Sequence, residues 1–151
     1  GVKSTTRALL GKELFEGLKL EEVTPLVNEV ERTWRRYAHK GLQYYDGQRF
    51  SLSKIVINKA GNRGWVQILM QSKFLPDIYF ELLIKIMGDG TWRAVDIRFM
   101  GITYVSIKKH HYRQIVNTRS TLALITYLSK KNEAYFSELC KPVDSEGHLP
   151  C

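Results

Sequence analysis

Five residues whose side chains can transfer protons lie close together in the sequence, in the second half of the chain. They comprise one aspartate, two tyrosines and two histidines: Asp96, Tyr104, His110, His111 and Tyr112. Groups of these types act as general acids or bases when an apolar cavity shifts their pKa values. Acid–base catalysis is therefore one interpretation of this region.

The local geometry of the same residues argues against catalysis. Asp96 alternates with Val95 and Ile97, so in a strand its carboxylate points away from their apolar side. Adjacent residues on a helix diverge by about 100°, which makes His110 and His111 poor joint ligands for one metal ion. We therefore expect binding and not catalysis, with no catalytic residue, no metal site and no cofactor.

Basic side chains form two clusters. The clusters are Arg32, Arg35, Arg36, His39 and Lys40, and Lys108, Lys109, His110, His111, Arg113 and Arg119. The net charge of +8 and the isoelectric point near 9.5 favour an anionic partner, which is nucleic acid, a lipid surface or an acidic protein. The sequence has no zinc finger, glycine-rich RNA motif or aromatic pair on a polar strand face, so we expect no nucleic-acid partner. A solvated helix face is the alternative for either cluster.

Apolar periodicity predicts helices at both ends of the chain and a sheet between them. The predicted helices span residues 5–18, 21–40, 103–117 and 120–139, and the predicted strands span residues 49–59, 65–73, 78–87 and 92–99. Pro25 suits only the first turn of a helix, which moves the expected start of the second helix toward Thr24. Thr103 is a candidate N-cap for the helix after the sheet. This order predicts an α+β fold with a curved, four-stranded antiparallel sheet.

The length of 151 residues fits one domain. We assign it to residues 1–140, followed by a loose tail at residues 141–151. Cys140 and Cys151 match no zinc-binding spacing, and both a disulfide between them and two free thiols fit the sequence. No apolar run is long enough to span a membrane.

One face of the predicted sheet is apolar almost throughout. Its residues alternate along the last three strands: Val66, Ile68, Met70, Phe80, Leu82, Ile84, Val95, Ile97 and Phe99. The neighbouring helices and junctions add Tyr37, Leu42, Tyr45, Ile102 and Tyr104. From the residues alone, this face is more simply a closed core than a ligand cavity, because apolar strand faces are usually buried.

Two blocks of sequence carry residues in an order that is specific in combination. The first block, at the end of the sheet, places in order Gly90, Trp92, Asp96, Gly101 and Thr103. The second block, from the end of a long helix into a strand, contains Leu42, Tyr45, Gly47, Gln48 and Phe50. Both blocks, with two strands between them, resemble the MlaC family of periplasmic phospholipid carriers, also called toluene-tolerance auxiliary proteins. The resemblance covers roughly residues 20–140.

The resemblance implies a nuclear-transport-factor-2-like cone, in which an apolar cavity holds phospholipid tails and leaves the headgroup near solvent. According to the resemblance, the lipid contacts the apolar strand face and the five helix and junction residues Tyr37, Leu42, Tyr45, Ile102 and Tyr104. The resemblance assigns to the headgroup, or to partner docking, Arg36, Lys40, Lys108, Lys109 and Arg113. A cone-fold enzyme, or a protein that binds a hopanoid or sterol-like molecule, is the alternative.

The resemblance also implies a cellular role. Family members shuttle phospholipid between an outer-membrane lipoprotein–porin complex and an inner-membrane ABC transporter complex, which maintains outer-membrane lipid asymmetry. A periplasmic location follows from this role. No apolar segment of a signal peptide follows Gly1, so we expect a processed chain from which the export signal has been removed.

Overall fold

The computed structural model describes residues 1–139, so the predicted tail, Cys140 and Cys151 lie outside the described residues. Three helices come first: α1 (Val2–Leu10), α2 (Lys12–Glu16) and α3 (Leu20–Leu42). Strands follow: β1 (Arg49–Ile57), β2 (Arg63–Gln71), β3 (Ile78–Ile86), β4 (Trp92–Phe99) and β5 (Ile102–Thr103). The last helices described are α4 (Tyr104–Thr118) and α5 (Thr121–Leu139). The predicted α+β class with an antiparallel sheet is confirmed.

The strands form one sheet in sequence order, β1-β2-β3-β4-β5. The prediction of four strands was wrong, because the chain turns back at Met100 and Gly101 and pairs with β4 once more. β5 has only two residues, too few for the alternation that identifies a strand in a sequence. Thr103 then caps α4 as predicted, and its hydroxyl accepts a hydrogen bond from the Ser106 amide at 3.0 Å.

Two helix predictions need correction. The helix predicted over residues 5–18 is two helices, because Gly11 adopts a φ of 87° and separates α1 from α2. α3 begins before Thr24, with the Glu22 carboxylate accepting a hydrogen bond from the Lys19 amide at 3.0 Å, so Pro25 lies inside the helix. The long apolar stripe that α3 buries outweighs the backbone hydrogen bond that Pro25 removes.

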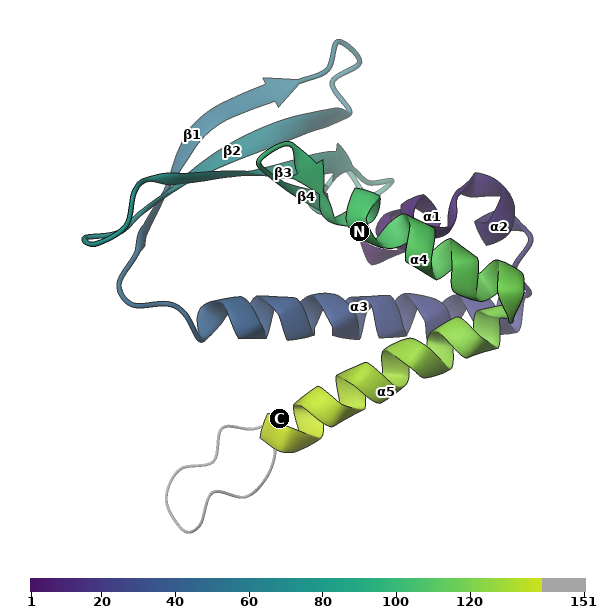
Figure 1. The fold of residues 1–151 in the computed structure, drawn as a ribbon. Coiled ribbons are helices and arrows are strands. Elements are labelled where there is room, and N and C mark those ends of the chain that lie inside the picture. Colours follow the sequence, from purple (N-terminus) through teal and green to yellow (C-terminus); the bar gives the residue numbers. More distant parts are fainter. Residues whose placement is uncertain (140–151) are drawn as a thin grey trace.

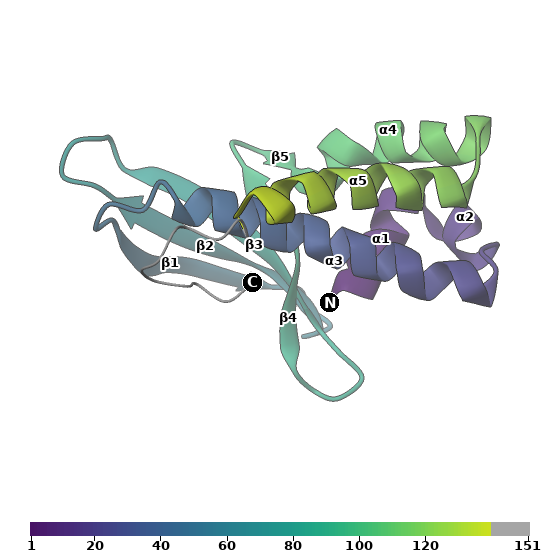
Figure 2. The same cartoon turned by 90° about the horizontal axis from the view of Figure 1, so that it is seen from below.

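The middle layer of the molecule is α3 (Figure 1). The curved sheet arches over one side of α3, and α5 lies along its other side. α4 runs from the sheet toward the end of the molecule that holds α1 and α2, and the view from below agrees (Figure 2). One flank of α3 therefore packs against helices, and the opposite flank faces the sheet.

The closed core lies among the helices and not under the sheet. It consists of apolar side chains that are less than a tenth exposed: Leu9, Leu10, Phe15, Leu26, Val30, Tyr112, Leu124 and Leu128. The helices that come closest to the sheet, α1 and α4, meet it at β4 and β5. The first strands therefore extend past the packed end of the molecule, and every residue of β1 is exposed.

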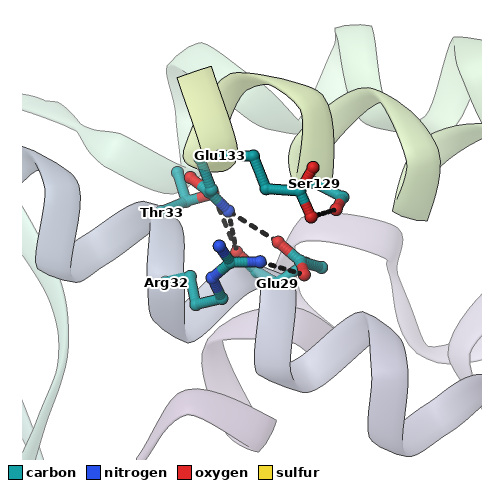
Figure 3. A network of polar contacts seen from close by, with 6 residues as sticks. Glu29, Arg32, Thr33, Ser129 and Glu133 are labelled. Atoms are coloured by element: carbon teal, nitrogen blue, oxygen red, sulfur yellow. Dashed lines mark hydrogen bonds and ion pairs between the residues drawn. The ribbon is translucent and has the colours of Figure 1, made fainter. Parts of the chain in front are cut away.

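A buried polar network fastens α5 to α3 (Figure 3). Asn132 and Thr33 are fully buried. The Asn132 side chain donates hydrogen bonds to the carboxylate of Glu29 at 2.8 Å and to its carbonyl at 3.1 Å. The Thr33 hydroxyl lies 3.2 Å from the Asn132 amide oxygen, and Arg32 pairs with the Glu29 carboxylate at 2.8 Å. These mutually satisfied groups fix the register of α5 on α3, which keeps the opposite flank of α3 turned toward the sheet.

Candidate functional site

The side of the sheet that faces α3, which we call the apolar face, carries rows of apolar side chains. Residues directly opposite each other in antiparallel strands project to the same side of the sheet. One row contains Leu52, Ile68, Phe80 and Phe99, and the next contains Ile55, Val66, Leu82 and Ile97. The flanking rows contain Phe50, Met70 and Ile78, and Ile57, Gly64, Ile84 and Ala94. None of these positions carries a hydrogen-bonding side chain.

Much of the apolar face is open, although its residue types are those of a core. On β1, Phe50, Leu52 and Ile55 are 54%, 61% and 51% exposed. On β4, Ile97 and Phe99 are 38% and 49% exposed. Monomeric proteins rarely leave so much contiguous apolar surface in water unless it binds something. The apolar face is therefore a candidate binding surface and not a closed core.

A cavity of about 470 Å³ lies between the apolar face, α3 and α4. It is lined by Trp34, Tyr37, Ala38, Leu82, Ile97, Tyr104, Ile107 and Lys108. Among these lining residues, Lys108 alone is charged. An apolar cavity with one cation at its wall suits a ligand that has a hydrocarbon part and an anionic group.

Aromatic side chains support the inner wall of the cavity. Trp34 and Tyr37 contact the Tyr104 ring edge-on, at centroid distances of 5.5 and 5.9 Å. The hydroxyl oxygens of Tyr104 and Tyr112 lie 3.4 Å apart. Burial raises the pKa of both phenols, so both stay protonated at neutral pH. They can form walls and donate hydrogen bonds, but they are not poised to act as bases.

The strand positions predicted for a ligand fall in the rows of the apolar face with one exception. The positions in these rows are Val66, Ile68, Met70, Phe80, Leu82, Ile84, Ile97 and Phe99. The predicted alternation fails at Val95, which is the extra residue of a β-bulge, so Ala94 takes the position opposite Ile84. Val95 is 8% exposed, and its carbonyl accepts a hydrogen bond from the Thr5 hydroxyl at 2.6 Å.

The helix and junction positions predicted for a ligand are more dispersed. Tyr37 and Tyr104 line the cavity. Tyr45 stacks on Phe50 with a centroid distance of 6.4 Å, at one end of the apolar face. Leu42 and Ile102 are well exposed and lie outside the set of residues that line the cavity.

Sequence reasoning missed the contribution of β1 to the apolar face. The missed residues are Phe50, Leu52, Ile55 and Ile57. The pairing register shifts between Leu52 and Lys54, which moves the apolar positions from even to odd residue numbers. The signal was present on each side of the shift, in Phe50 and Leu52 before it and in alternate isoleucines after it.

Several of the predicted basic residues already have partners inside the protein. Arg113 donates a hydrogen bond to the Leu9 carbonyl at 3.2 Å and so holds the end of α1. Arg35 pairs with Glu31 at 2.6 Å along the exposed side of α3. Lys109 is exposed on α4. These side chains lie away from the cavity wall.

Other cations lie over tyrosine rings, two of them on the Tyr37 ring that lines the cavity. The Arg36 guanidinium and the Lys108 ammonium lie 5.3 and 5.9 Å from the centroid of the same ring, that of Tyr37. Arg36 is 7% exposed, and its Nε atom has no hydrogen-bond partner among the described residues. Lys40 lies over Tyr135 of α5 at 5.1 Å. An anionic group near Tyr37 would find two positive charges there.

Two other candidates for proton transfer, Asp96 and His111, lie outside the set of residues that line the cavity. Asp96 is 6% exposed and points away from the apolar face as predicted, opposite Leu83. Its carboxylate accepts a hydrogen bond from the Val105 amide at 3.3 Å, at the start of α4. His111 packs edge-on against Tyr127 of α5. Asp96 therefore has a structural role at the junction of β4 and α4.

Within residues 1–139, no three side chains of the His, Cys, Asp or Glu types gather closely enough to hold a metal ion. None of the helices described there is both long enough and apolar enough to cross a bilayer.

Comparison with known proteins gives a family and a fold. The sequence profile of the MlaC protein family matches residues 2–130. A phospholipid-binding protein from Ralstonia solanacearum, solved with a bound phospholipid at 1.53 Å, has a similar fold, with a TM-score of 0.76 and 14% sequence identity. The similarity covers 90% of this chain and 75% of that one, while no curated protein sequence matches. Since the family profile spans most of the sequence, this chain belongs to the MlaC family.

Proposed function

We propose that this protein is a periplasmic phospholipid carrier, which shuttles lipid between the two membranes and so maintains outer-membrane lipid asymmetry. The observation that carries the proposal is the apolar face, where four strands align apolar rows that stay partly exposed beside an apolar cavity. Membership in the MlaC family supports the same ligand class, as does the phospholipid bound to the R. solanacearum protein of similar fold.

The apolar face would keep the tails of a bound lipid out of water. Each methylene removed from water contributes about 0.8 kcal/mol, so two tails with about thirty methylenes gain about 20 kcal/mol. The tails are equally dry in a bilayer, so exchange between carrier and membrane is nearly balanced. Such a carrier needs neither ATP nor a catalytic residue, and we propose no reaction at the site.

The two parts of the lipid would meet different surfaces. The tails would lie along the apolar face, over Leu82 and Ile97, and enter the cavity beside Tyr37. The headgroup would stay near solvent beside Lys108 and Arg36, whose charges suit a phosphate. In this arrangement the sheet and α3 would form the walls of a nuclear-transport-factor-2-like cone.

Loading and emptying require partners at both membranes. By family resemblance these are an outer-membrane lipoprotein–porin complex and an inner-membrane ABC transporter complex. The net charge of +8 favours acidic docking surfaces on them. Lys40 and Lys109 are our candidates for the docking residues on this protein.

Native mass spectrometry of the purified chain, followed by solvent extraction and lipid analysis, tests the proposal. We expect a mass increment equal to one diacyl phospholipid, and the extract would identify its headgroup class. A hopanoid or sterol-like molecule in the extract would replace phospholipid as the ligand. An apo protein that also fails to take up phospholipid from vesicles would contradict the carrier function.

A further inference from the structure

Three connections at one end of the sheet carry exposed apolar side chains. At this end β1 and β3 begin while β2 and β4 end, because neighbouring strands are antiparallel. Figures 1 and 2 both place the α3–β1 and β2–β3 connections at the end of the molecule opposite α1 and α2. The exposed apolar side chains of the three connections, together with Ile102 at the start of β5, form what we call the apolar rim: Tyr44, Tyr45, Phe74, Leu75, Met100 and Ile102.

The connections that carry the apolar rim are neighbours in space. Gly47 of the first connection and Lys73 of the second line one surface pocket. Asp77 of the second and Met100 of the third line another. The rim is therefore one edge of the molecule and not three separate loops.

The rim side chains project into water to an unusual degree. Phe74, Met100 and Tyr44 are 88%, 83% and 81% exposed. Leu75 and Tyr45 are each more than half exposed. Other residues of the described chain leave these apolar side chains uncovered. An apolar partner surface or a membrane would cover them.

The backbone at Met100 points to the same conclusion. Met100 adopts a φ of 50° and Gly101 a φ of 81°. Two successive positive φ values are typical of the tight turn that asparagine and glycine prefer, so a methionine there is strained. Strained residues cluster at functional sites, so the strain at Met100 supports a functional role for this turn.

The rim is continuous with the apolar face. Tyr45 stacks on Phe50, and the Phe50 ring meets the edge of Phe80 at a centroid distance of 6.5 Å. At the other side of the rim, Ile102 pairs with Phe99, which pairs with Phe80. A hydrocarbon tail can thus pass from the rim to the cavity in contact with apolar side chains throughout.

Charge distinguishes a bilayer from a protein partner at this edge. The rim connections and the residues flanking them carry Arg49 and Lys73, which Asp46 and Asp77 balance. This edge therefore has no net charge with which to select an acidic protein. Exposed aromatic and aliphatic side chains with basic residues nearby are typical of segments that lie in a membrane interface.

We propose that the apolar rim inserts shallowly into the interface of a phospholipid bilayer, so that a tail moves between bilayer and apolar face without crossing water. The lipid path rests on the proposed carrier function. Membrane docking by the rim does not, because it can be measured on protein that carries no lipid.

Flotation with vesicles of phosphatidylcholine tests the docking. Phe74→Ser and Met100→Asn should each weaken vesicle binding, and the double variant should weaken it about tenfold or more. Met100→Asn suits the positive φ, so its thermal midpoint should not fall. Leu122→Ser, which removes a leucine that is 66% exposed on α5, is the matched control and should bind as the unchanged protein does.

The outcomes separate this proposal from the carrier function. Rim variants that retain bound phospholipid in native mass spectrometry but extract it from vesicles at least about tenfold more slowly support both. Unchanged vesicle binding in the double variant would overturn the docking proposal alone. Binding that high salt abolishes would assign docking to charge and overturn it as well. A dimer that the Phe74→Ser change dissociates would make the rim an interface between two copies instead.

Discussion

At the scale of single residues, Ile97 separates the closed-core interpretation from the carrier interpretation. It pairs with Leu82 on the apolar face, lines the cavity and is 38% exposed. A side chain in this position can lose its apolar character without leaving a buried charge stranded, because water reaches it. The fold should therefore tolerate a change there that the ligand does not.

Ile97→Glu is predicted to abolish phospholipid binding and to leave the protein folded. A carboxylate at the cavity wall would face the lipid tails with no partner, which is costly only when the tails are present. Native mass spectrometry reports the lipid, and circular dichroism melting reports the fold. Leu122→Glu is the control, since Leu122 is exposed on α5 outside the cavity. Unfolding by Ile97→Glu, with Leu122→Glu stable, would favour a closed core.

Lys108→Ala is predicted to weaken binding of anionic phospholipids by about fivefold, the effect of one basic residue near an anionic headgroup. Lys108 lines the cavity and shares the Tyr37 ring with Arg36. The neighbouring Lys109→Ala change is the control, because Lys109 is exposed outside the cavity. Competition between phosphatidylglycerol and phosphatidylcholine measures the preference. Equal effects of the two changes would assign Lys108 to general charge attraction.

Residue types located most of the apolar face, because alternation reports which side of a strand each residue occupies. The alternation predicted the wrong position for Val95 and missed the contribution of β1, because bulges shift the register by one residue in both places. A bulge is a property of two paired strands, so the sequence of one strand does not reveal it. Residue types also could not tell Arg113, which donates a hydrogen bond to the Leu9 carbonyl, from Arg36, whose Nε atom has no hydrogen-bond partner within residues 1–139. That difference depends on packing between helices.

At the scale of elements, the contact between α3 and α5 depends on a few buried polar groups. Asn132→Ala is predicted to destabilise the fold by about 2 kcal/mol, because it removes the hydrogen bonds that the buried Asn132 amide makes with Glu29 and with the Thr33 hydroxyl. Urea unfolding measures the change. Ser129→Ala on the exposed side of α5 is the control, since its hydrogen bond to Glu133 lies at the surface. Similar losses in both variants would contradict a role for the buried network.

The outer side of the sheet holds a charge pair whose contribution to stability depends on pH. Arg98 donates a hydrogen bond to Glu81 at 2.6 Å, and this bond lowers the pKa of Glu81 below its usual value of 4.5. A lowered pKa in the folded state contributes stability above pH 4.5, which is lost as the pH falls through the folded pKa.

The unchanged protein should therefore lose stability more steeply than Glu81→Gln in acid. Thermal midpoints measured from neutral pH down to below pH 4.5, the usual pKa of Glu81, provide the comparison. The two proteins should differ most at neutral pH and converge in acid. Parallel curves across this range would show that the Glu81–Arg98 pair contributes nothing that depends on protonation.

Element types followed from apolar periodicity, and the predicted bounds of β4 match the structure. The predicted ends of the helices were wrong where the local preference of one residue competes with packing. Pro25 favours the start of a helix, yet the buried stripe of α3 extends the helix before it. The sequence at Gly11 is compatible with either a weakened helix or a break between two helices. In the structure the chain breaks there, and the Arg113 guanidinium packs so closely that a Cβ at Gly11 would lie 3.0 Å from it.

At the scale of the whole molecule, stability and binding belong to different parts. The helical core holds the fold together, whereas the open strands present apolar surface that the helices of residues 1–139 cover only in part. This division explains how a face made of core-like residues stays available to a ligand. Under the proposed carrier function, a bound lipid would complete the packing of the sheet.

Removal of bound phospholipid is therefore predicted to lower the thermal midpoint. A ligand that binds the folded state alone stabilises it in proportion to its occupancy. Differential scanning calorimetry before and after delipidation, followed by reloading from vesicles, measures the effect. A midpoint that does not change on delipidation and reloading would show that the sheet needs no ligand to complete it.

The most direct test of the central claim is photo-cross-linking with a phospholipid that carries a diazirine in one tail, followed by peptide mass spectrometry. We predict adducts on the apolar face, including Leu52 and Ile55 of β1, and on Tyr37 of α3. The β1 adducts are the decisive ones, because these residues would be irrelevant to a ligand confined to the cavity. Adducts confined to the exposed side of α5, or no adducts at all, would contradict the claim that the apolar face holds lipid tails.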